Sequence, residues 1–257
     1  MARKTAIVVG TGFIGEKICS ILSDSYEIVA IDKDLNTLQN LSNQYITKEA
    51  DCLNEKEVEG IFNEIFSESN YPYVLVNAIG LDSKINKENP SDGFADFSNQ
   101  KLVDFEKSLR INLSCIFLTC QNFYKNLQKI GKEGIILNIS SDLGHIAPDH
   151  RLYNDNNNKN PNQKPAHYSV SKFGVEGFTK YLAATVSPLI RVNSLCPSGI
   201  LNDGMTDEFI EKLKDLNPMK EVLELNNLTG AIKFLTTDES EFVNGQSILL
   251  DGGRSIL

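Results

Sequence analysis

Short apolar segments rich in valine and isoleucine recur along this chain and alternate with longer stretches of helical periodicity. The strand-like segments are Thr5–Val9, Glu27–Ile31, Tyr73–Asn77, Gly134–Ile139, Ile190–Leu195 and Gln246–Leu250, with a weaker one at Tyr45–Ala50. They are apolar throughout, as expected of strands in a parallel sheet that is covered on both faces. The pattern predicts an α/β, doubly wound Rossmann fold with about seven parallel strands and helices on both faces.

The segments between these strands carry helical spacing. Candidate helices are Phe13–Leu22, Asn54–Phe66, Phe97–Leu127, His167–Val186 and Asn227–Leu235. We expect a single domain over residues 1–257, because the length suits one hydrophobic core and no linker or repeat is visible. Two stretches break the alternation, and we expect a substrate loop around 142–167 and a lid around 198–224. The first includes the asparagine-rich run Asn154–Pro165, which is typical of an exposed loop, and the second includes a helical pattern at Asp207–Leu216.

The net charge of -9 argues against nucleic acid or an anionic membrane surface as a main partner, because both require clustered lysine and arginine. No apolar run approaches the roughly 20 residues that span a bilayer. The apolar stretch after the basic start is too short for a signal-peptide core. We therefore expect a cytoplasmic protein that acts on a small molecule.

The cysteines and histidines indicate neither a disulfide framework nor a metal centre. The five cysteines (Cys19, Cys52, Cys115, Cys120 and Cys196) are odd in number and contain no CxxC pair, which suits reduced thiols. All three histidines lie between His145 and His167, and no cysteine is near them along the chain. We expect no metal site.

A glycine-rich segment, Gly10-Thr11-Gly12-Phe13-Ile14-Gly15, joins the first strand to the first helix. In a GxGxxG turn the first glycine permits the tight turn, the second lets the backbone approach a pyrophosphate, and the third allows close helix–strand packing. The helix N-terminus then receives the phosphate charge. A glycine-rich turn without a ligand is the alternative, but the position at the first strand–helix junction favours dinucleotide binding.

Asp32 ends the second strand, near the position about 20 residues beyond the glycines where an acidic side chain accepts hydrogen bonds from the adenosine ribose. A carboxylate there repels a 2′-phosphate, so we expect NAD in preference to NADP. Lys33 follows and could weaken this preference. Asp32 could also be a simple turn residue.

Tyr168 and Lys172 stand four residues apart, so they share one face of a helix. An ammonium near a phenol favours the phenolate and moves the tyrosine pKa toward a value useful for acid–base chemistry. The spacing alone is close to coincidence, but its neighbours strengthen it. Ser140 and Ser141 follow a buried strand at the end where α/β sheets bind ligands. Asn112 lies in a helical stretch, where asparagine is unfavourable unless its amide has a partner.

Taken together, these residues resemble the short-chain dehydrogenase/reductase family in its compact form, over the whole chain. The resemblance implies that Tyr168 is the general acid/base and that Lys172 lowers its pKa and holds the nicotinamide ribose. It implies that Ser141 hydrogen-bonds the substrate oxygen and that Asn112 supports a water in a proton relay. It also implies cofactor contacts at Gly10, Gly12, Phe13, Ile14, Gly15, Asp32, Asp51, Cys52, Asn77, Ala78, Ile79, Tyr168, Lys172, Pro197, Ser198 and Ile200.

Three features depart from the family's usual pattern. Phe13 replaces the middle glycine of TGxxxGxG, and valines replace its Thr-Gly. Ile79 replaces the glycine of Asn-Asn-Ala-Gly and Ser198 the glycine of Pro-Gly, and both changes touch the cofactor cleft. The interval between Ser141 and Tyr168 is also longer than usual.

That interval contains all three histidines (His145, His150 and His167) and Arg151. One interpretation is a solvated loop. The other is a loop that covers the substrate and presents Arg151 or a histidine to an anionic or polyhydroxylated group. The run 147–153 and the loop after it resemble family members associated with bacterial surface-glycan and flagellin-modification sugar pathways.

The sequence therefore predicts an oxidoreductase that transfers hydride between NAD(H) and an alcohol or ketone carbon of a small polar substrate, such as a sugar or sugar phosphate. A 3-oxoacyl-carrier-protein reductase using NADP(H) is one alternative, and Asp32 and the acidic charge count against it. A catalytically silent nucleotide-binding sensor is the other, and the intact catalytic set counts against it. The resemblance also suggests a homodimer or homotetramer, although core packing explains Phe117, Phe123, Phe173 and Phe178 equally well.

Overall fold

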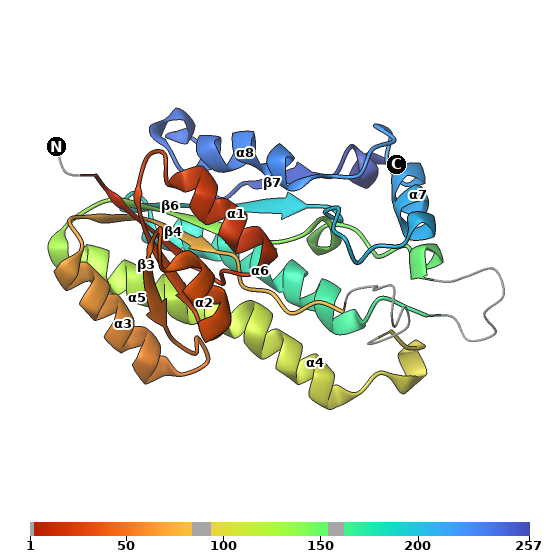
Figure 1. Ribbon diagram of the computed structural model, residues 1–257, viewed down its shortest axis with the longest axis horizontal. Coiled ribbons are helices and arrows are strands. Elements are labelled where there is room, and N and C mark those ends of the chain that lie inside the picture. Colours follow the sequence, from red (N-terminus) through yellow and green to blue (C-terminus); the bar gives the residue numbers. More distant parts are fainter. Residues whose placement is uncertain (1–2, 84–93, 154–161) are drawn as a thin grey trace.

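The computed structural model describes residues 3–83, 94–153 and 162–257, and its strands form one parallel sheet (Figure 1). The strands are β1 (Thr5–Val9), β2 (Glu27–Asp32), β3 (Ile46–Glu49), β4 (Pro72–Asn77), β5 (Gly134–Ile139), β6 (Ile190–Pro197) and β7 (Ser247–Leu250). Their order is β3-β2-β1-β4-β5-β6-β7, and every neighbouring pair is parallel. The predicted seven-stranded, doubly wound Rossmann sheet is confirmed.

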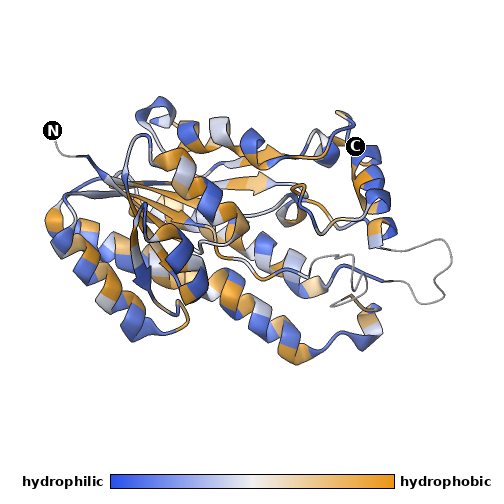
Figure 2. Cartoon of the chain, viewed as in Figure 1, coloured by the Kyte–Doolittle hydropathy of each residue, from blue (hydrophilic) through white to orange (hydrophobic). Residues whose placement is uncertain are grey.

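Helices cover both faces of this sheet (Figure 1). They are α1 (Phe13–Leu22), α2 (Leu35–Leu41), α3 (Glu55–Glu68), α4 (Leu102–Leu109), α5 (Cys115–Ile130), α6 (Ala166–Val186), α7 (Asp207–Asp215) and α8 (Leu228–Leu235). Successive strand residues point to opposite faces. Ala6 and Val8 pack with α1, α2 and α8, whereas Ile7 and Val9 pack with α3, α5 and α6. Because both faces are buried, the strands are apolar throughout, as Figure 2 shows at the centre of the molecule.

Two helical elements differ from the sequence-based expectation. Helix α2 was not predicted, since its seven residues give too short a pattern; Asp34 begins it by accepting a hydrogen bond from the Asn36 N–H at 2.9 Å. The stretch expected as one helix over Phe97–Leu127 is interrupted. It contains a 3-10 turn, then α4, a π-helical turn at Arg110–Ser114, and α5. Such π turns occur often at functional sites.

The predicted substrate loop and lid pack against each other. Leu152 of the loop contacts Met205 and Leu213 of the lid in a small apolar cluster. Residues 154–161 of the asparagine-rich run lie outside the described residues. The end of that run was expected to be exposed, but Lys164 and Pro165 are buried where the chain enters α6.

The phenylalanines named as interface candidates divide into two pairs. Phe123 is completely buried and belongs to the core, and Phe178 packs against the same core, so the interface interpretation fails for Phe123. Phe117 and Phe173 are 46% and 48% exposed. Within the described ranges, no helix combines the length and apolar character that crossing a membrane requires.

Candidate active site

The carboxyl ends of the strands open onto two adjoining cavities. The larger holds about 500 Å³ and extends from the glycine-rich turn to Tyr168 and Lys172. The smaller holds about 170 Å³ and is bordered by the predicted substrate loop and lid. Both are lined by Phe13, Ile14, Asp82, Ser140 and Tyr168. The fold therefore places the predicted tyrosine on the boundary between a long cleft and a small pocket.

The glycine-rich turn begins the larger cavity. Gly10 has a φ of +83°, and a Cβ there would lie 2.9 Å from the Ala78 backbone. A Cβ at Gly15 would lie 1.9 Å from the Gly10 carbonyl oxygen. Gly12 differs, because no atom lies within 4 Å of the place its Cβ would take. The fold therefore needs Gly10 and Gly15, whereas Gly12 leaves space at the N-terminus of α1 that suits a phosphate.

Asp32 is held rigidly at the end of β2. Its Oδ2 accepts hydrogen bonds from the Thr11 N–H at 2.7 Å and the Thr11 hydroxyl at 3.2 Å. Its Oδ1 accepts a third from the Asp34 N–H at 3.1 Å. Thr11 is completely buried, and the sequence analysis did not identify it. Asp32 lines the larger cavity, as do the predicted residues Gly10, Gly12, Phe13, Ile14, Asp51, Cys52, Ala78, Ile79, Tyr168 and Lys172.

Five predicted cofactor residues do not line this cavity, and Gly15, which packs against the Gly10 backbone, is one of them. Asn77 is completely buried and does not line the cavity; its side chain accepts a hydrogen bond from Thr119 Oγ1 at 2.7 Å and donates one to Asn138 Oδ1 at 2.9 Å. Its side chain therefore joins β4 to its neighbours. The other three, Pro197, Ser198 and Ile200, line the smaller cavity rather than the larger one.

The side chain of Asn112 projects from the π-helical turn and is completely buried. It accepts a hydrogen bond from the Leu81 N–H at 2.6 Å and donates to the Leu81 carbonyl at 3.0 Å. It also donates to Ser171 Oγ at 2.9 Å. The amide thus ties the segment after β4 to α6, directly beside Lys172. These are the partners that an asparagine inside a helical stretch requires.

Ser141 begins a chain of polar contacts at the end of β5. Its hydroxyl donates to Asp142 Oδ1 at 2.9 Å, and Asp142 Oδ2 accepts a hydrogen bond from Arg254 Nη1 at 2.8 Å. Both members of this ion pair are almost fully buried. Burial raises the pKa of Asp142, and the charge of Arg254 opposes that shift. Ser141 also hydrogen-bonds Tyr168.

The environment of Tyr168 differs from the one expected. Burial, followed by the charge of Asp82, raises its pKa well above the ordinary value, and the hydrogen bond with Ser141 only partly offsets this. Burial also lowers the pKa of Lys172 to about 8. The Lys172 ammonium donates to the Ile139 carbonyl at 3.0 Å and lies 5.8 Å from the Tyr168 ring centroid. Without a bound cofactor, the direction of the Tyr168 shift is opposite to the predicted one.

Several known proteins are similar to this chain in sequence or in fold. A family model described as enoyl-(acyl carrier protein) reductase matches residues 25–255. Post-translational flagellin modification protein A of Campylobacter coli is 30% identical over 270 residues, which cover 98% of each chain. A 3-oxoacyl-(acyl-carrier-protein) reductase of Aquifex aeolicus is 27% identical over 267 residues, covering 97% of this chain and 96% of the relative. A crystal structure of a short chain dehydrogenase from Leptospira borgpetersenii with bound NAD+ is 31% identical, with a TM-score of 0.85 and coverage of 99% of this chain and 94% of the other.

The chain belongs to the short-chain dehydrogenase/reductase family. The resemblance seen in the sequence is confirmed, including the likeness to a flagellin-modification protein. This short-chain dehydrogenase/reductase is an NAD(P)-dependent enzyme.

The smaller cavity of this short-chain dehydrogenase/reductase contains charged residues that the sequence analysis missed. Lys164 is 6% exposed, pairs with Asp82 and lies 4.4 Å from the Tyr168 ring centroid. Arg254 approaches from the far end of the chain. Arg151, the predicted ligand of an anionic group, instead pairs with Asp149 and has an 87% exposed side chain. None of the three histidines lines either cavity.

The separation of residues along the chain also did not indicate which possible metal ligands lie close together. Cys196 ends up beside His145, with Sγ 3.5 Å from the histidine Nε2, although 51 residues separate them. Parallel strands and their following loops converge at one edge of the sheet, so chain separation does not measure spatial separation.

We predict that alanine weakens cofactor binding at Gly12 and lowers stability at Gly15. Gly15→Ala places a methyl group against the Gly10 backbone, so it should lower the thermal unfolding midpoint strongly. Gly12→Ala should leave that midpoint nearly unchanged but weaken NAD binding about tenfold or more, because its methyl group enters the phosphate space. Differential scanning fluorimetry and calorimetric titration with NAD measure the two effects. Parental NAD affinity in Gly12→Ala would contradict the assignment of this turn.

Proposed function

We propose that this protein transfers hydride between NAD(H) and an alcohol or ketone carbon of a small polar substrate, with Tyr168 as general acid/base. The observation that carries the proposal is the position of Tyr168, which lines both the cofactor-sized cleft and the smaller pocket. A substrate oxygen in that pocket can reach the phenol while its carbon faces the cleft. Ser141, which hydrogen-bonds Tyr168, is positioned to hold the same oxygen.

The nicotinamide, when bound, supplies or accepts the hydride. In reduction, the Tyr168 hydroxyl gives its proton to the alkoxide oxygen that forms at the substrate, and in oxidation the phenolate takes the hydroxyl proton. Because the pKa of Tyr168 is high, the free enzyme holds a protonated phenol at neutral pH. This state is ready for reduction. Lys172, which lines the larger cavity, would hold the nicotinamide ribose, and Asn112 would order the water that relays the proton.

The cofactor we propose is NAD. The Asp32 carboxylate lines the cleft and is fixed by three hydrogen bonds, so it cannot turn away from a 2′-phosphate without breaking them. A ribose with free hydroxyls can instead donate to it. Lys33 also lines the cleft but carries a long, exposed side chain.

The charged residues of the smaller cavity favour a polyhydroxylated substrate. Lys164 with Asp82 and Arg254 with Asp142 supply both donors and acceptors around Tyr168. A sugar can satisfy such groups when it displaces water from them. An acyl chain would remove water from these ion pairs without offering them new hydrogen bonds, which is costly.

A 3-oxoacyl-carrier-protein reductase is the second candidate, because the family model and the Aquifex aeolicus relative carry related descriptions. The net charge of -9 opposes this function, since the carrier protein is acidic. A screen of free and phosphorylated sugars, with a 3-oxoacyl carrier protein as comparison, separates the two candidate functions. The absorbance of the reduced cofactor shows which substrate is turned over.

We also propose a homo-oligomer, a dimer or tetramer, built on α5 and α6. Phe117 on α5 and Phe173 on α6 are about half exposed, and Val170, one helical turn before Phe173, is 46% exposed. Large apolar side chains that gather on one surface are typical of subunit contacts.

Tyr168→Phe should abolish most of the turnover with the best substrate from this screen. General acid–base catalysis contributes about 10²–10⁴-fold, so a loss in that range is expected. NAD affinity and the unfolding midpoint should stay close to those of the parent. Tyr181→Phe, on the exposed side of the same helix, is the matched control and should keep its activity. Full turnover in Tyr168→Phe would overturn the mechanism.

Asp32→Ser should change the cofactor preference. The ratio of kcat/KM for NAD to that for NADP should fall about tenfold or more, because the repulsion of the 2′-phosphate is removed. Steady-state kinetics with both cofactors measure this ratio. Glu27→Gln removes a carboxylate from the opposite end of β2 and should leave the ratio unchanged. An unaltered ratio in Asp32→Ser would show that other residues select the cofactor.

Lys164→Met should lower kcat/KM for the sugar substrate about tenfold or more, because methionine keeps the packing but removes the charged donor. NAD binding should not change. If the single variant is unstable because Asp82 loses its partner, Lys164→Met combined with Asp82→Asn removes both charges. Lys180→Met, on the exposed face of α6, is the control. Equal kcat/KM in the variant and the parent would exclude Lys164 from substrate binding.

A further inference from the structure

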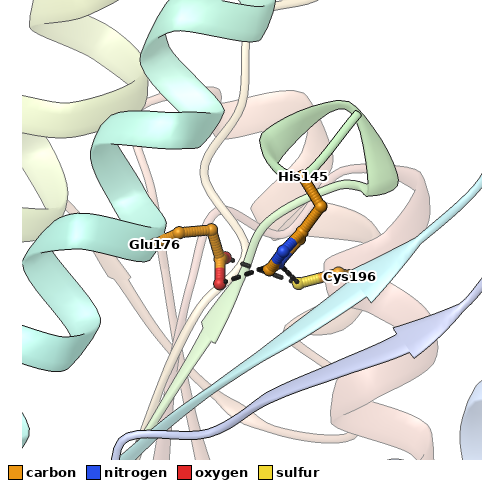
Figure 3. Close-up of side chains that lie close together, drawn as sticks. All are labelled: His145, Glu176 and Cys196. Carbon is orange, nitrogen blue, oxygen red and sulfur yellow. Dashed lines mark hydrogen bonds and ion pairs between the residues drawn. The ribbon is translucent and has the colours of Figure 1, made fainter. Parts of the chain in front are cut away.

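Three side chains with metal-binding groups converge outside the two cavities (Figure 3). His145 comes from the segment after β5, Glu176 from α6 and Cys196 from β6. His145 Nε2 lies 3.1 Å from Glu176 Oε2 and 3.5 Å from Cys196 Sγ, and Cys196 Sγ lies 3.4 Å from Glu176 Oε1. None of the three lines either cavity, so the reaction proposed above does not use them.

These separations are close to those within a tetrahedral zinc site. Zinc bonds are about 2.0–2.1 Å to a histidine nitrogen, about 2.0–2.2 Å to a carboxylate oxygen and about 2.3 Å to a thiolate. At tetrahedral angles, such bonds hold neighbouring ligand atoms about 3.3–3.6 Å apart. The two contacts of Glu176 involve different carboxylate oxygens, so binding through one of them requires the carboxylate to rotate; one ligand atom of each residue already lies within 4.8 Å of the other two.

We propose that His145, Glu176 and Cys196 form a zinc site in which water takes the fourth position. The ion replaces the proton of the Cys196 thiol and any proton on His145 Nε2. The thiolate and the Glu176 carboxylate then balance its two positive charges. The net charge of this site affects Lys172, because the charge of Lys172 interacts with both Glu176 and Cys196.

The surroundings orient the carboxylate in advance. Ser194 Oγ donates to Glu176 Oε2 at 2.8 Å, and Ser247 Oγ donates to the same oxygen. Hydrogen bonds of this kind to metal-binding groups fix their direction and tune their affinity. Cys196 is completely buried and Glu176 nearly so, whereas the side chain of His145 is 25% exposed. The histidine side is therefore the route by which an ion reaches the site.

A zinc ion here would join three segments that also contribute residues to the lining of the two cavities. Glu176 lies one helical turn beyond Lys172, Cys196 precedes Pro197, and His145 follows Ser141 by one short turn. Bonds among these segments stabilise the folded state relative to the unfolded chain, in which no such site exists. The ion's role is thus structural, and it does not depend on which substrate the enzyme reduces.

The test is metal binding by the purified full-length chain after treatment with a chelator. Titration with zinc alone should give about one ion per chain and raise the unfolding midpoint by about 5 °C or more at a hundredfold excess over Kd. Cobalt(II) in place of zinc should give the absorption of a tetrahedral site with a thiolate-to-metal band. Both His145→Ala and Cys196→Ser should weaken zinc binding at least tenfold and abolish the corresponding spectrum.

Matched controls are Cys19→Ala, which removes a buried cysteine from α1, and His150→Ala, which removes a histidine from the substrate loop. Both should bind zinc like the parent. Because His145 is partly exposed, its alanine variant should fold even if the Cys196 variant does not. Absence of stoichiometric zinc, a cobalt spectrum without a thiolate band, or parental affinity in His145→Ala would overturn the proposal. Those results would show that hydrogen bonds alone, and no metal ion, connect the three side chains.

Discussion

The burial of both faces of the parallel sheet determines where this protein can place polar chemistry. Helices α1, α2 and α8 cover one face and α3, α5 and α6 the other, so most strand side chains meet only apolar neighbours. Polar groups are left mainly at the strand ends, where the carboxyl ends of β1 to β6 converge. Ligand sites in such sheets form there because backbone donors, helix N-termini and loop side chains meet at one edge.

Burial also controls the charge states at that edge. It raises the pKa of Tyr168 and lowers that of Lys172, so it favours the neutral form of each group. The charged residues that line the smaller cavity are arranged as pairs, Lys164 with Asp82 and Arg254 with Asp142. Paired charges around a high-pKa phenol make a pocket that is neutral in total but rich in donors and acceptors. That composition suits a substrate with several hydroxyl groups better than an apolar chain.

Local patterns predicted the local structure around part of this candidate site. The GxGxxG turn lies at the first strand–helix junction, and Gly10 and Gly15 have the tight backbone contacts that such a turn requires. The side-chain amide of Asn112 has the hydrogen-bond partners that an asparagine inside a helical stretch requires. The π-helical turn that holds it escaped prediction, because one inserted residue changes helical periodicity very little. Lys164 was also misjudged, since a composition rich in asparagine and proline says nothing about which single side chain turns inward.

The sequence by itself determined the order of the candidate functional residues along the chain. A glycine-rich turn comes first, an acidic residue follows the second strand, and then come Asn112, Ser141, Tyr168 and Lys172. The sequence could do so because each feature lies within a locally recognisable element and because their order along the chain resembles that of the short-chain dehydrogenase/reductase family. Only the tertiary structure decided which groups from distant segments meet. Arg254 reaches Asp142 across 112 residues, and Cys196 reaches His145 across 51. Such contacts arise from how parallel strands and their loops converge in space, and no local pattern records that convergence.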